Sequence, residues 1–313
     1  MPTGMVQPNV SVVITSFNQA EYLREALESV IQQTVKPHQV IVADDHSTKD
    51  NSVDVIRGYM SRYPGWIDGI FHEQNVSIPK NRNSALQRVT GNYVVVLDGD
   101  DRLLPNFIAG HLQALSDHPE AGCSYSNRYH IDPQGIRLRV RNTTAEPSGD
   151  VFAYIAATRM GVLRSLVARY DLIKAAGFFD ERFIHHDGFI LTLRLARLTK
   201  FVHLHEPLME KRIHTSGFSK TISARERIRC FEDVLAEVIK LSSHLPSQEI
   251  RGIRETWIRK ILKLRVAKAL AEGRRAEAFW EVARKLRCSR RRMRTLWSAT
   301  KQCWDDRPPI TLP

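Results

Sequence analysis

The chain has 313 residues, of which 42% are hydrophobic, and it carries a formal net charge of +12. This length is enough to bury a full hydrophobic core and to form two domains. No stretch contains the ~18 apolar residues of a membrane span, and Met1–Val10 lacks the apolar core of a secretory signal. The cysteines lack CxxC or metal-ligand spacing and predict reduced thiols; they are Cys123, Cys230, Cys288 and Cys303. Composition therefore excludes a helical membrane protein and predicts a globular protein of the cytoplasm.

The positive charge is concentrated in the last third of the chain. Residues 221–313 contain 22 Lys and Arg against 11 Asp and Glu, so they carry a net charge of +11. The first 220 residues carry the remaining +1. We therefore predict two regions, a near-neutral body over residues 9–220 and a basic region over residues 221–313.

Strands and helices alternate in the first hundred residues. Short apolar runs rich in β-branched residues predict buried strands at residues 9–16, 39–43, 70–73 and 93–97. Apolar periodicity and capping residues predict helices at residues 20–33, 53–62 and 79–89. This alternation predicts an α/β fold, in which right-handed crossovers join the strands of a mostly parallel sheet.

Polar clusters follow three of these predicted strands. They are Thr15–Phe17, Asp44–Asp45 and Asp98–Asp101. In open parallel sheets, ligands bind beyond the carboxyl ends of the strands. We therefore expect the three clusters to meet at one ligand-binding edge of the sheet.

The third cluster has the composition of a cation site. Asp98 and Asp100 supply hard oxygen ligands on either side of Gly99, which is small enough to let a ligand come close. Oxygen ligation suits Mg²⁺ or Mn²⁺, usually with a substrate phosphate completing the shell. The alternative is an acidic turn after a strand, with no ligand.

Four segments resemble one known family in content, order and spacing. They read SVVITSFNQAEYLREALESVIQQT, VIVADDHST, PKNRNSAL and GNYVVVLDGDD. Together they resemble the inverting glycosyltransferases of family two, and the resemblance continues past residue 200, over about two thirds of the chain. It implies the GT-A fold, a Rossmann-like nucleotide-binding sheet flanked by helices, and a nucleotide-sugar donor.

The resemblance implies roles for the residues of the nucleotide side. Thr15 and Phe17 would flank the base, with Phe17 as a stacking surface. Asp45, with Asp44 beside it, would accept a hydrogen bond from a pyrimidine N–H. Arg82, in the segment before the acidic strand, would approach the nucleotide.

The resemblance also implies the diphosphate and metal contacts. Asp98 and Asp100 match the DxD pair, of which Asp100 would be the direct ligand of Mn²⁺ or Mg²⁺ and Asp98 would also face the nucleotide. The later Arg-x-His segment offers His214 as an extra metal ligand and Arg212 as a donor fork for the diphosphate. The chain departs from the family at Asn81, where many relatives have a small residue.

Asp187 stands where the family keeps its catalytic base, and His186 replaces the usual Glu before it. A carboxylate at the start of a helix is also stabilised by unpaired backbone N–H groups. Asp187 is therefore predicted to be the base, with helix capping as the alternative.

The segments after the acidic cluster are less regular. Helices are expected at residues 104–116 and 190–198, and strands at residues 122–126, 136–141 and 201–204. In the strand at residues 136–141, every second residue is an arginine: Arg137, Arg139 and Arg141. This pattern predicts a charged edge strand that blocks aggregation. Phosphate binding is the less favoured alternative.

The basic region contains three amphipathic helices, around residues 231–239, 250–266 and 276–286. A helical cap on the catalytic body explains most of this pattern. The Arg290–Arg294 run precedes Leu296–Trp297, a composition typical of interfacial anchors. For this cluster an anionic membrane surface is the favoured partner, and nucleic acid is disfavoured because no nucleic-acid motif accompanies the charge.

The resemblance implies an inverting transfer of a sugar, from a UDP-sugar above all, to a hydroxyl of a saccharide or lipid-linked acceptor. Bacterial-type surface polysaccharide or glycoconjugate assembly is the expected setting. A nucleotidyltransferase is one alternative, but it would need a Gly-rich, Lys-bearing loop after the first strand, which residues 15–18 do not provide. The second alternative is a membrane- or polyanion-binding protein that has an inactive transferase fold.

Overall fold

The computed structural model describes residues 9–141, 146–158, 165–214 and 222–275, together with residues 277, 278 and 281. The predicted helix at 276–286 falls almost wholly outside these residues, and the Arg290–Arg294 run and Leu296–Trp297 fall outside them entirely.

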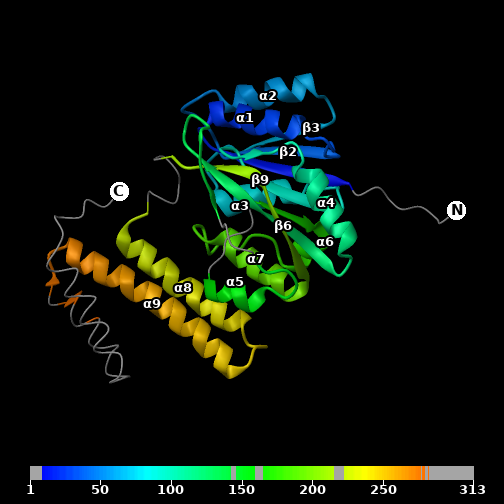
Figure 1. Ribbon diagram of the computed structural model, residues 1–313. Helices are drawn as coiled ribbons and strands as arrows, with labels where there is room; N and C mark the ends of the chain where they lie inside the picture. Colours follow the sequence, from blue (N-terminus) through cyan, green and yellow to red (C-terminus); the bar gives the residue numbers. More distant parts are fainter. Residues whose placement is uncertain are drawn as a thin grey trace.

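The described residues form one mixed sheet covered by helices on both faces (Figure 1). The strands are β1 Val10–Ser16, β2 Gln39–Asp44, β3 Ile67–Phe71, β4 Tyr93–Asp98, β5 Arg102–Leu103, β6 Ala121–Ile131, β7 Arg137–Arg141, β8 Leu166–Arg169 and β9 Lys200–Arg212. The helices are α1 Ala20–Ile31, α2 Ser52–Arg62, α3 Ile78–Leu86, α4 Phe107–Asp117, α5 Phe152–Thr158, α6 Tyr170–Ala175, α7 Asp187–Leu198, α8 Ala224–Leu241 and α9 Ser247–Ala271.

The strand order is β3-β2-β1-β4-β8-β6-β9-β5, and β7 pairs with β6. The first four strands in this order are parallel, as predicted, whereas β8 runs antiparallel to both of its neighbours. In the register of β1, Thr15 lies opposite Asp98 of β4 and Ser16 opposite Asp44 of β2. The three predicted polar clusters therefore do meet at one edge of the sheet.

Alternate residues of the central strands belong to two separate cores. Val12 and Ile14 pack with α1, α2 and α4 on one face, whereas Val13 packs with the helices of the other face. All seven residues of β1 are buried. Burial on both faces explains why these strands are continuously apolar instead of alternating.

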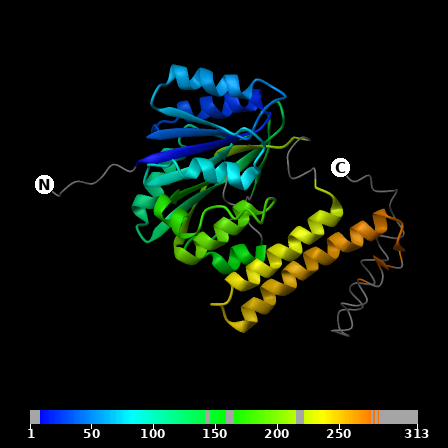
Figure 2. The ribbon, with the colours of Figure 1, turned by 180° about the vertical axis from the view of Figure 1, so that it is seen from behind.

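The helices α8 and α9 pack on the sheet body as an antiparallel pair beside α5 and α7, on the far side of the sheet from α1 and α2 (Figures 1 and 2). Their apolar residues, including Phe231, Val238 and Trp257, belong to the same core as α7. The Trp257 indole is wholly buried and donates to the Ala156 carbonyl of α5 at 2.7 Å. This packing is what the predicted helical cap requires.

The strands β6 and β9 are much longer than their sequences predict. They pair with each other from Ala121 to Ile131, beyond the apolar segments at 122–126 and 201–204. The added parts contain buried charged residues such as Glu210 and Arg212. These break the apolar pattern, but their partners in the fold satisfy them. The strand β8 went unpredicted, β3 begins three residues earlier than predicted, and α7 begins three residues before its predicted start.

The predicted edge strand is observed as β7, which pairs with β6 and with no other described strand. β7 follows a turn in which the Gly135 N–H donates to the Asp132 carbonyl. Gly135 has a φ of +84° in this turn. Arg137 is not simply solvated, because its guanidinium lies 4.1 Å from the ring centre of Tyr129 and pairs with Glu210.

Candidate active site

The loops that follow β1 and β2 are fastened together as one unit. Asn18, with a φ of +50°, accepts hydrogen bonds at its side-chain oxygen from the Thr48 and Lys49 N–H groups, at 3.0 and 2.9 Å. The neighbouring Phe17 is 46% exposed. Thr15 is buried, and its carbonyl accepts the Gly99 N–H. The predicted stacking ring thus stands open to solvent at the edge of the sheet.

The two neighbouring acids after β2 have different environments. Asp44 is buried and accepts from both the backbone N–H (2.7 Å) and the hydroxyl (2.5 Å) of Ser47. Burial raises the pKa of the Asp44 carboxyl above its ordinary value, although the bonds from Ser47 act in the opposite direction. Asp45 accepts the Val76 N–H at Oδ1, at 2.6 Å. Asp44 therefore shapes its own turn, whereas Asp45 faces the segment that leads into α3.

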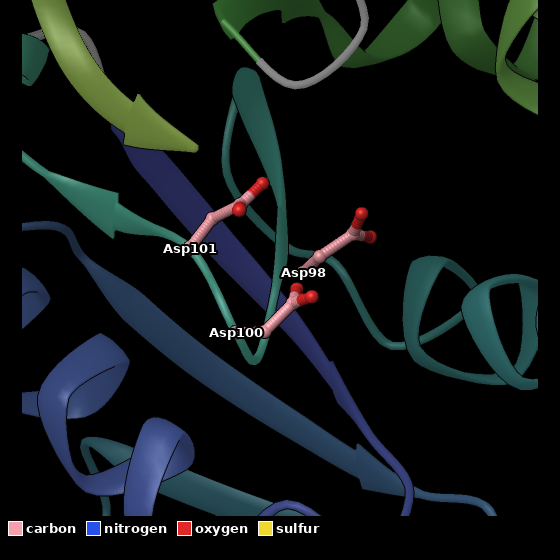
Figure 3. A group of neighbouring side chains, drawn as sticks. All are labelled: Asp98, Asp100 and Asp101. Atoms are coloured by element: carbon pink, nitrogen blue, oxygen red, sulfur yellow. The ribbon is translucent and has the colours of Figure 1, made fainter. Parts of the chain in front are cut away.

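Three carboxylates converge at the end of β4 (Figure 3). One oxygen each of Asp98, Asp100 and Asp101 lies within 4.8 Å of the others. Asp98 and Asp100 are partly exposed, with 14% and 22% of their side chains accessible. Asp101 is buried and accepts the Arg212 N–H at 2.9 Å. The first two acids therefore fit a cation site, and the third attaches the turn to β9.

Gly99 is required by the packing of this turn against β1. A Cβ at this position would lie 2.5 Å from Nε2 of Gln19 and 2.8 Å from the Thr15 carbonyl oxygen. The Gly99 N–H donates to that carbonyl at 2.9 Å. The structure thus gives Gly99 a role in strand contact, where the sequence suggested only room for a ligand.

His214 lies next to the acids, as predicted. Its Nε2 is 2.9 Å from Oδ2 of Asp100, and its ring centre is 5.4 Å from that of Tyr22 in α1. Tyr22, which the sequence did not single out as a site residue, is half-buried and also lies 4.4 Å from the Arg212 guanidinium. Two partly exposed carboxylates beside an imidazole form a donor set that suits a divalent cation.

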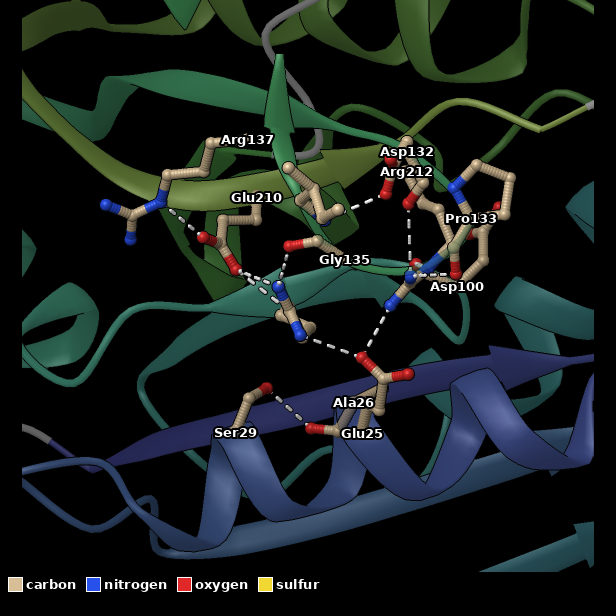
Figure 4. A network of polar contacts seen from close by, with 12 residues as sticks. Glu25, Ala26, Ser29, Asp100, Asp132, Pro133, Gly135, Arg137, Glu210 and Arg212 are labelled. Carbon is tan, nitrogen blue, oxygen red and sulfur yellow. Dashed lines mark hydrogen bonds and ion pairs between the residues drawn. The ribbon is translucent and has the colours of Figure 1, made fainter. Parts of the chain in front are cut away.

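The Arg212 side chain is fully buried, and backbone carbonyls accept most of its hydrogen bonds (Figure 4). Nε donates to the Asp100 carbonyl at 3.1 Å, and Nη1 donates to the carbonyls of Asp132 (3.2 Å) and Pro133 (2.8 Å). Nη2 pairs with Glu25 of α1 at 2.6 Å. Arg212 therefore joins the acidic turn to the β6–β7 turn and to α1. Its contact with a diphosphate stays a prediction.

A second arginine, Arg102, extends this network to β9. Arg102 of β5 donates to Glu25 at 2.8 Å, to Glu210 of β9 at 2.9 Å and to the Gly135 carbonyl at 3.1 Å. The other carboxylate oxygen of Glu210 accepts from Arg137 at 2.7 Å. The sequence did not single out Glu25, because an acid in an amphipathic helix usually faces solvent.

Arg82 of α3 joins Asp98, in the acidic turn, to the predicted base Asp187. Its Nη2 pairs with Oδ1 of Asp98, and its Nη1 lies 2.5 Å from Oδ2 of Asp187. The side chains of Arg82 and Asp187 are each only 8% exposed. A single planar guanidinium thus bridges two carboxylates from different parts of the fold.

Asp187 is the first residue of α7, and His186 is the N-cap. Oδ1 of Asp187 accepts the N–H of the next residue, Gly188, at 2.7 Å, while Oδ2 faces Arg82. His186 is buried, with its ring edge-on to Phe231 of α8. The residue that departs from the family pattern therefore contacts α8.

Asn81 is buried at the start of α3 and donates to the Ala43 carbonyl of β2 at 3.0 Å. Its side-chain oxygen has no hydrogen-bond partner among the described residues. The departure at this position therefore serves a contact between α3 and the sheet.

Comparison with known proteins gives one family and one fold. The sequence model of glycosyl transferase family 2 matches residues 11–188. An uncharacterized glycosyltransferase of Methanocaldococcus jannaschii is 26% identical over 211 residues, which cover 67% of this chain and 72% of that protein. The matches to other curated relatives span 21 to 50% of the length of those proteins.

Two solved structures have the same GT-A fold. S. aureus TarS (residues 1–349) in complex with UDP-GlcNAc superposes with a TM-score of 0.61 and 16% identity, covering 87% of this chain and 89% of that one. The mannosyltransferase PcManGT from Pyrobaculum calidifontis, in complex with GDP-Man and Mn²⁺, gives 0.60 and 16%, covering 97% and 89%.

Proposed function

Because the chain belongs to glycosyl transferase family 2, we propose that it transfers a sugar from a UDP-sugar to an acceptor hydroxyl, with inversion at the anomeric carbon. The observation that carries the proposal is the convergence of Asp98 and Asp187 on Arg82. It joins a candidate metal ligand and a candidate base in one partly buried site. Family membership speaks against the nucleotidyltransferase alternative.

In this proposal Asp187 is the general base. Its Oδ2 takes the proton of the acceptor hydroxyl while the acceptor oxygen bonds to the anomeric carbon, on the face opposite the leaving group. The bond from that carbon to the diphosphate oxygen breaks, and the nucleoside diphosphate departs with the electron pair. Since the diphosphate is already a good leaving group, no second protein acid is needed.

The donor contacts follow from the same site. Asp45 accepts the N3–H of uracil and Phe17 stacks on the base. Asp98, Asp100 and His214 would hold Mn²⁺ or Mg²⁺, an interpretation supported by their short mutual distances. Such an ion, when bound, neutralises the charge that develops on the departing diphosphate. TarS binds UDP-GlcNAc and PcManGT binds GDP-Man with Mn²⁺, so a nucleotide-sugar site is common to both neighbours.

The proposal predicts that transfer requires a divalent ion. We expect EDTA to abolish sugar release from UDP-sugars, and excess Mn²⁺ to restore it. Asp100→Ala should abolish release while the protein keeps its melting temperature, because losing one of several clustered like charges relieves repulsion. Asp68→Ala, at an exposed surface pair with Arg88, is the matched control and should retain activity.

The assay should screen UDP-, GDP- and dTDP-sugars, with nucleotide Kd measured by calorimetry. Full transfer in excess chelator would contradict the metal role. Tighter binding of GDP than of UDP would contradict the uracil contact of Asp45.

We also propose that the acceptor is a saccharide or a lipid-linked saccharide of bacterial-type surface polysaccharide or glycoconjugate assembly, used at the cytoplasmic face of a membrane. In the described part of the chain, no helix has the length and apolar character needed to cross a bilayer. The support comes from α9, where four cationic side chains are exposed along the helix: Arg251, Arg254, Arg259 and Lys263. Exposed cations of this kind attract an anionic lipid surface, at about 1 kcal/mol for each cation near it.

This surface can be tested by sedimentation with vesicles. We expect binding to vesicles containing phosphatidylglycerol, weakening at high salt, and none to phosphatidylcholine alone. Replacing Arg254 and Arg259 by Glu should reduce binding, whereas the same change at Arg57 and Arg62 of α2 should not. Equal binding by both double variants would refute a role for α9.

A further inference from the structure

The helix that begins with Asp187 lies along α8, a helix beyond the part of the chain that matches the family (Figure 1). Three contacts join the two helices, in the same order along both. They are the ring pair His186–Phe231 (5.4 Å between centres), the ion pair Arg194–Glu237 (3.7 Å) and the bond from Arg197 to the Leu241 carbonyl (2.8 Å). The base-bearing end of α7 is therefore fixed against α8.

Glu237 of α8 belongs to a cluster of four charges, in which Asp180, Glu237 and Arg194 are largely buried and Arg182 is 64% exposed. Its two carboxylate oxygens lie 3.7 Å from Nη2 of Arg194 and of Arg182, and its side chain is only 9% exposed. Both arginines also pair with Asp180, at 2.5 and 2.7 Å. Hydrogen bonding from Arg182 holds the pKa of the Asp180 carboxyl well below its ordinary value. The cluster joins α8 to α7 and to the loop that leads into α7.

That loop transmits its position directly to Asp187. The Phe183 N–H donates to the Asp180 carbonyl at 3.0 Å, and the His186 N–H donates to the Phe183 carbonyl at 2.8 Å. Phe178 has a φ of +57°, a conformation that an aromatic residue adopts only where its surroundings impose it. The loop is held from two sides. Asn83 of α3 exchanges two hydrogen bonds with the backbone of Phe179, both at 2.9 Å, and the contacts with α8 described above hold its other side.

We propose, on the basis of the proposed function, that Glu237 and Phe231 of α8 are positioning residues for the base. Glu237 holds Arg182 and Arg194, which both pair with Asp180, and Phe231 holds His186, so that Asp187 keeps its carboxylate directed at Arg82 and the reacting hydroxyl. The C-terminal region then contributes to catalysis without touching substrate. The His186 departure from the family becomes the means by which this region reaches the base.

The primary test is Glu237→Gln, which keeps the shape of the side chain and removes its charge. We expect kcat to fall about tenfold, since displacements of ~1 Å at a reacting group cost up to about 10²-fold. Donor Kd and donor KM should stay at the parental values, because none of the predicted nucleotide contacts lies on α7, on α8 or in the loop that leads into α7. Phe231→Leu should give the same split through His186.

The matched control is Glu232→Gln, five residues earlier on the same helix. Glu232 pairs with Arg265 of α9, and no contact of its carboxylate with α7 is observed in the described residues. It should keep the parental kcat. The proposal is overturned if Glu237→Gln and Phe231→Leu keep the parental kcat, if donor Kd weakens in step with kcat, or if Glu232→Gln loses as much.

A second readout separates this inference from the proposed function itself. Hydrogen exchange of residues 177–190 is measured by mass spectrometry on the parent and on Glu237→Gln. Faster exchange of this segment in the variant supports the positioning role, and unchanged exchange overturns it. If the parent transfers no sugar from any donor, the proposed function has failed, and the exchange result still decides whether α8 holds the loop.

Discussion

Asp187→Asn is expected to lower the rate of transfer by about 10²–10⁴-fold, the usual cost of losing a general base. Asn has nearly the shape of Asp, but its amide cannot take the proton of the acceptor hydroxyl. The donor contacts predicted at Asp45, Asp98 and Asp100 are unchanged, so donor Kd should stay near the parental value. Measuring Kd and transfer rate on the same variant separates binding from chemistry.

The structure adds an effect on stability, because Oδ2 of Asp187 pairs with the buried Arg82. Asn weakens that pair, so we expect a lower melting temperature than that of the parent. Asp171→Asn is a suitable control, since Asp171 is also an acid in the first turn of a helix but pairs at the surface with Arg169. A near-parental transfer rate would mean that the base lies elsewhere and that Asp187 only anchors Arg82.

Arg82→Met is expected to destabilise the fold by about 3–5 kcal/mol, the range for breaking a buried ion pair from one side. It leaves Asp98 and Asp187 facing each other without the cation that both now contact. Urea unfolding gives the free energy of unfolding directly. Added Mn²⁺ should recover part of the loss, because a cation bound at Asp98 stabilises the state that binds it.

The control for this variant is Arg88→Met, two residues beyond α3. Arg88 pairs with Asp68 at 3.2 Å, and both side chains are about half exposed. An exposed pair of this kind contributes about 1 kcal/mol or less. If Arg82→Met costs no more than this control, the bridge between the two acids contributes little to stability.

The meeting of the three polar clusters at one edge of the sheet could be predicted because its signals are local. Each predicted strand of the first half is a short apolar run, and each polar cluster follows directly in the sequence. Parallel pairing then aligns Thr15 with Asp98 and brings Asp44 alongside. The acidic turn follows the same local pattern. His214 and Asp187 were singled out by the family resemblance; the structure places His214 beside the acidic turn and Asp187 at the start of α7.

The remaining features depend on contacts between distant segments, which the sequence does not encode locally. Arg82 and Asp187 are 105 positions apart in the sequence, so no local sequence pattern predicts that they pair. The Arg-x-His segment suggested that Arg212 contacts the diphosphate. In the structure its guanidinium is buried and donates to backbone carbonyls, and the sequence alone does not distinguish the two roles. The full length of strand β9 was not predicted because His205, Glu206 and Pro207 interrupt its apolar pattern directly after residue 204.

The acidic turn is held by the fold at every residue from Gly99 to Asp101. Gly99 is bonded to the Thr15 carbonyl, the carbonyl of Asp100 accepts from Arg212, and the carboxylate of Asp101 accepts the Arg212 N–H. The backbone of this turn therefore loses its conformational entropy during folding, before any ligand arrives. A bound cation and diphosphate need to order only the ends of two short side chains, so more of their interaction free energy remains as affinity.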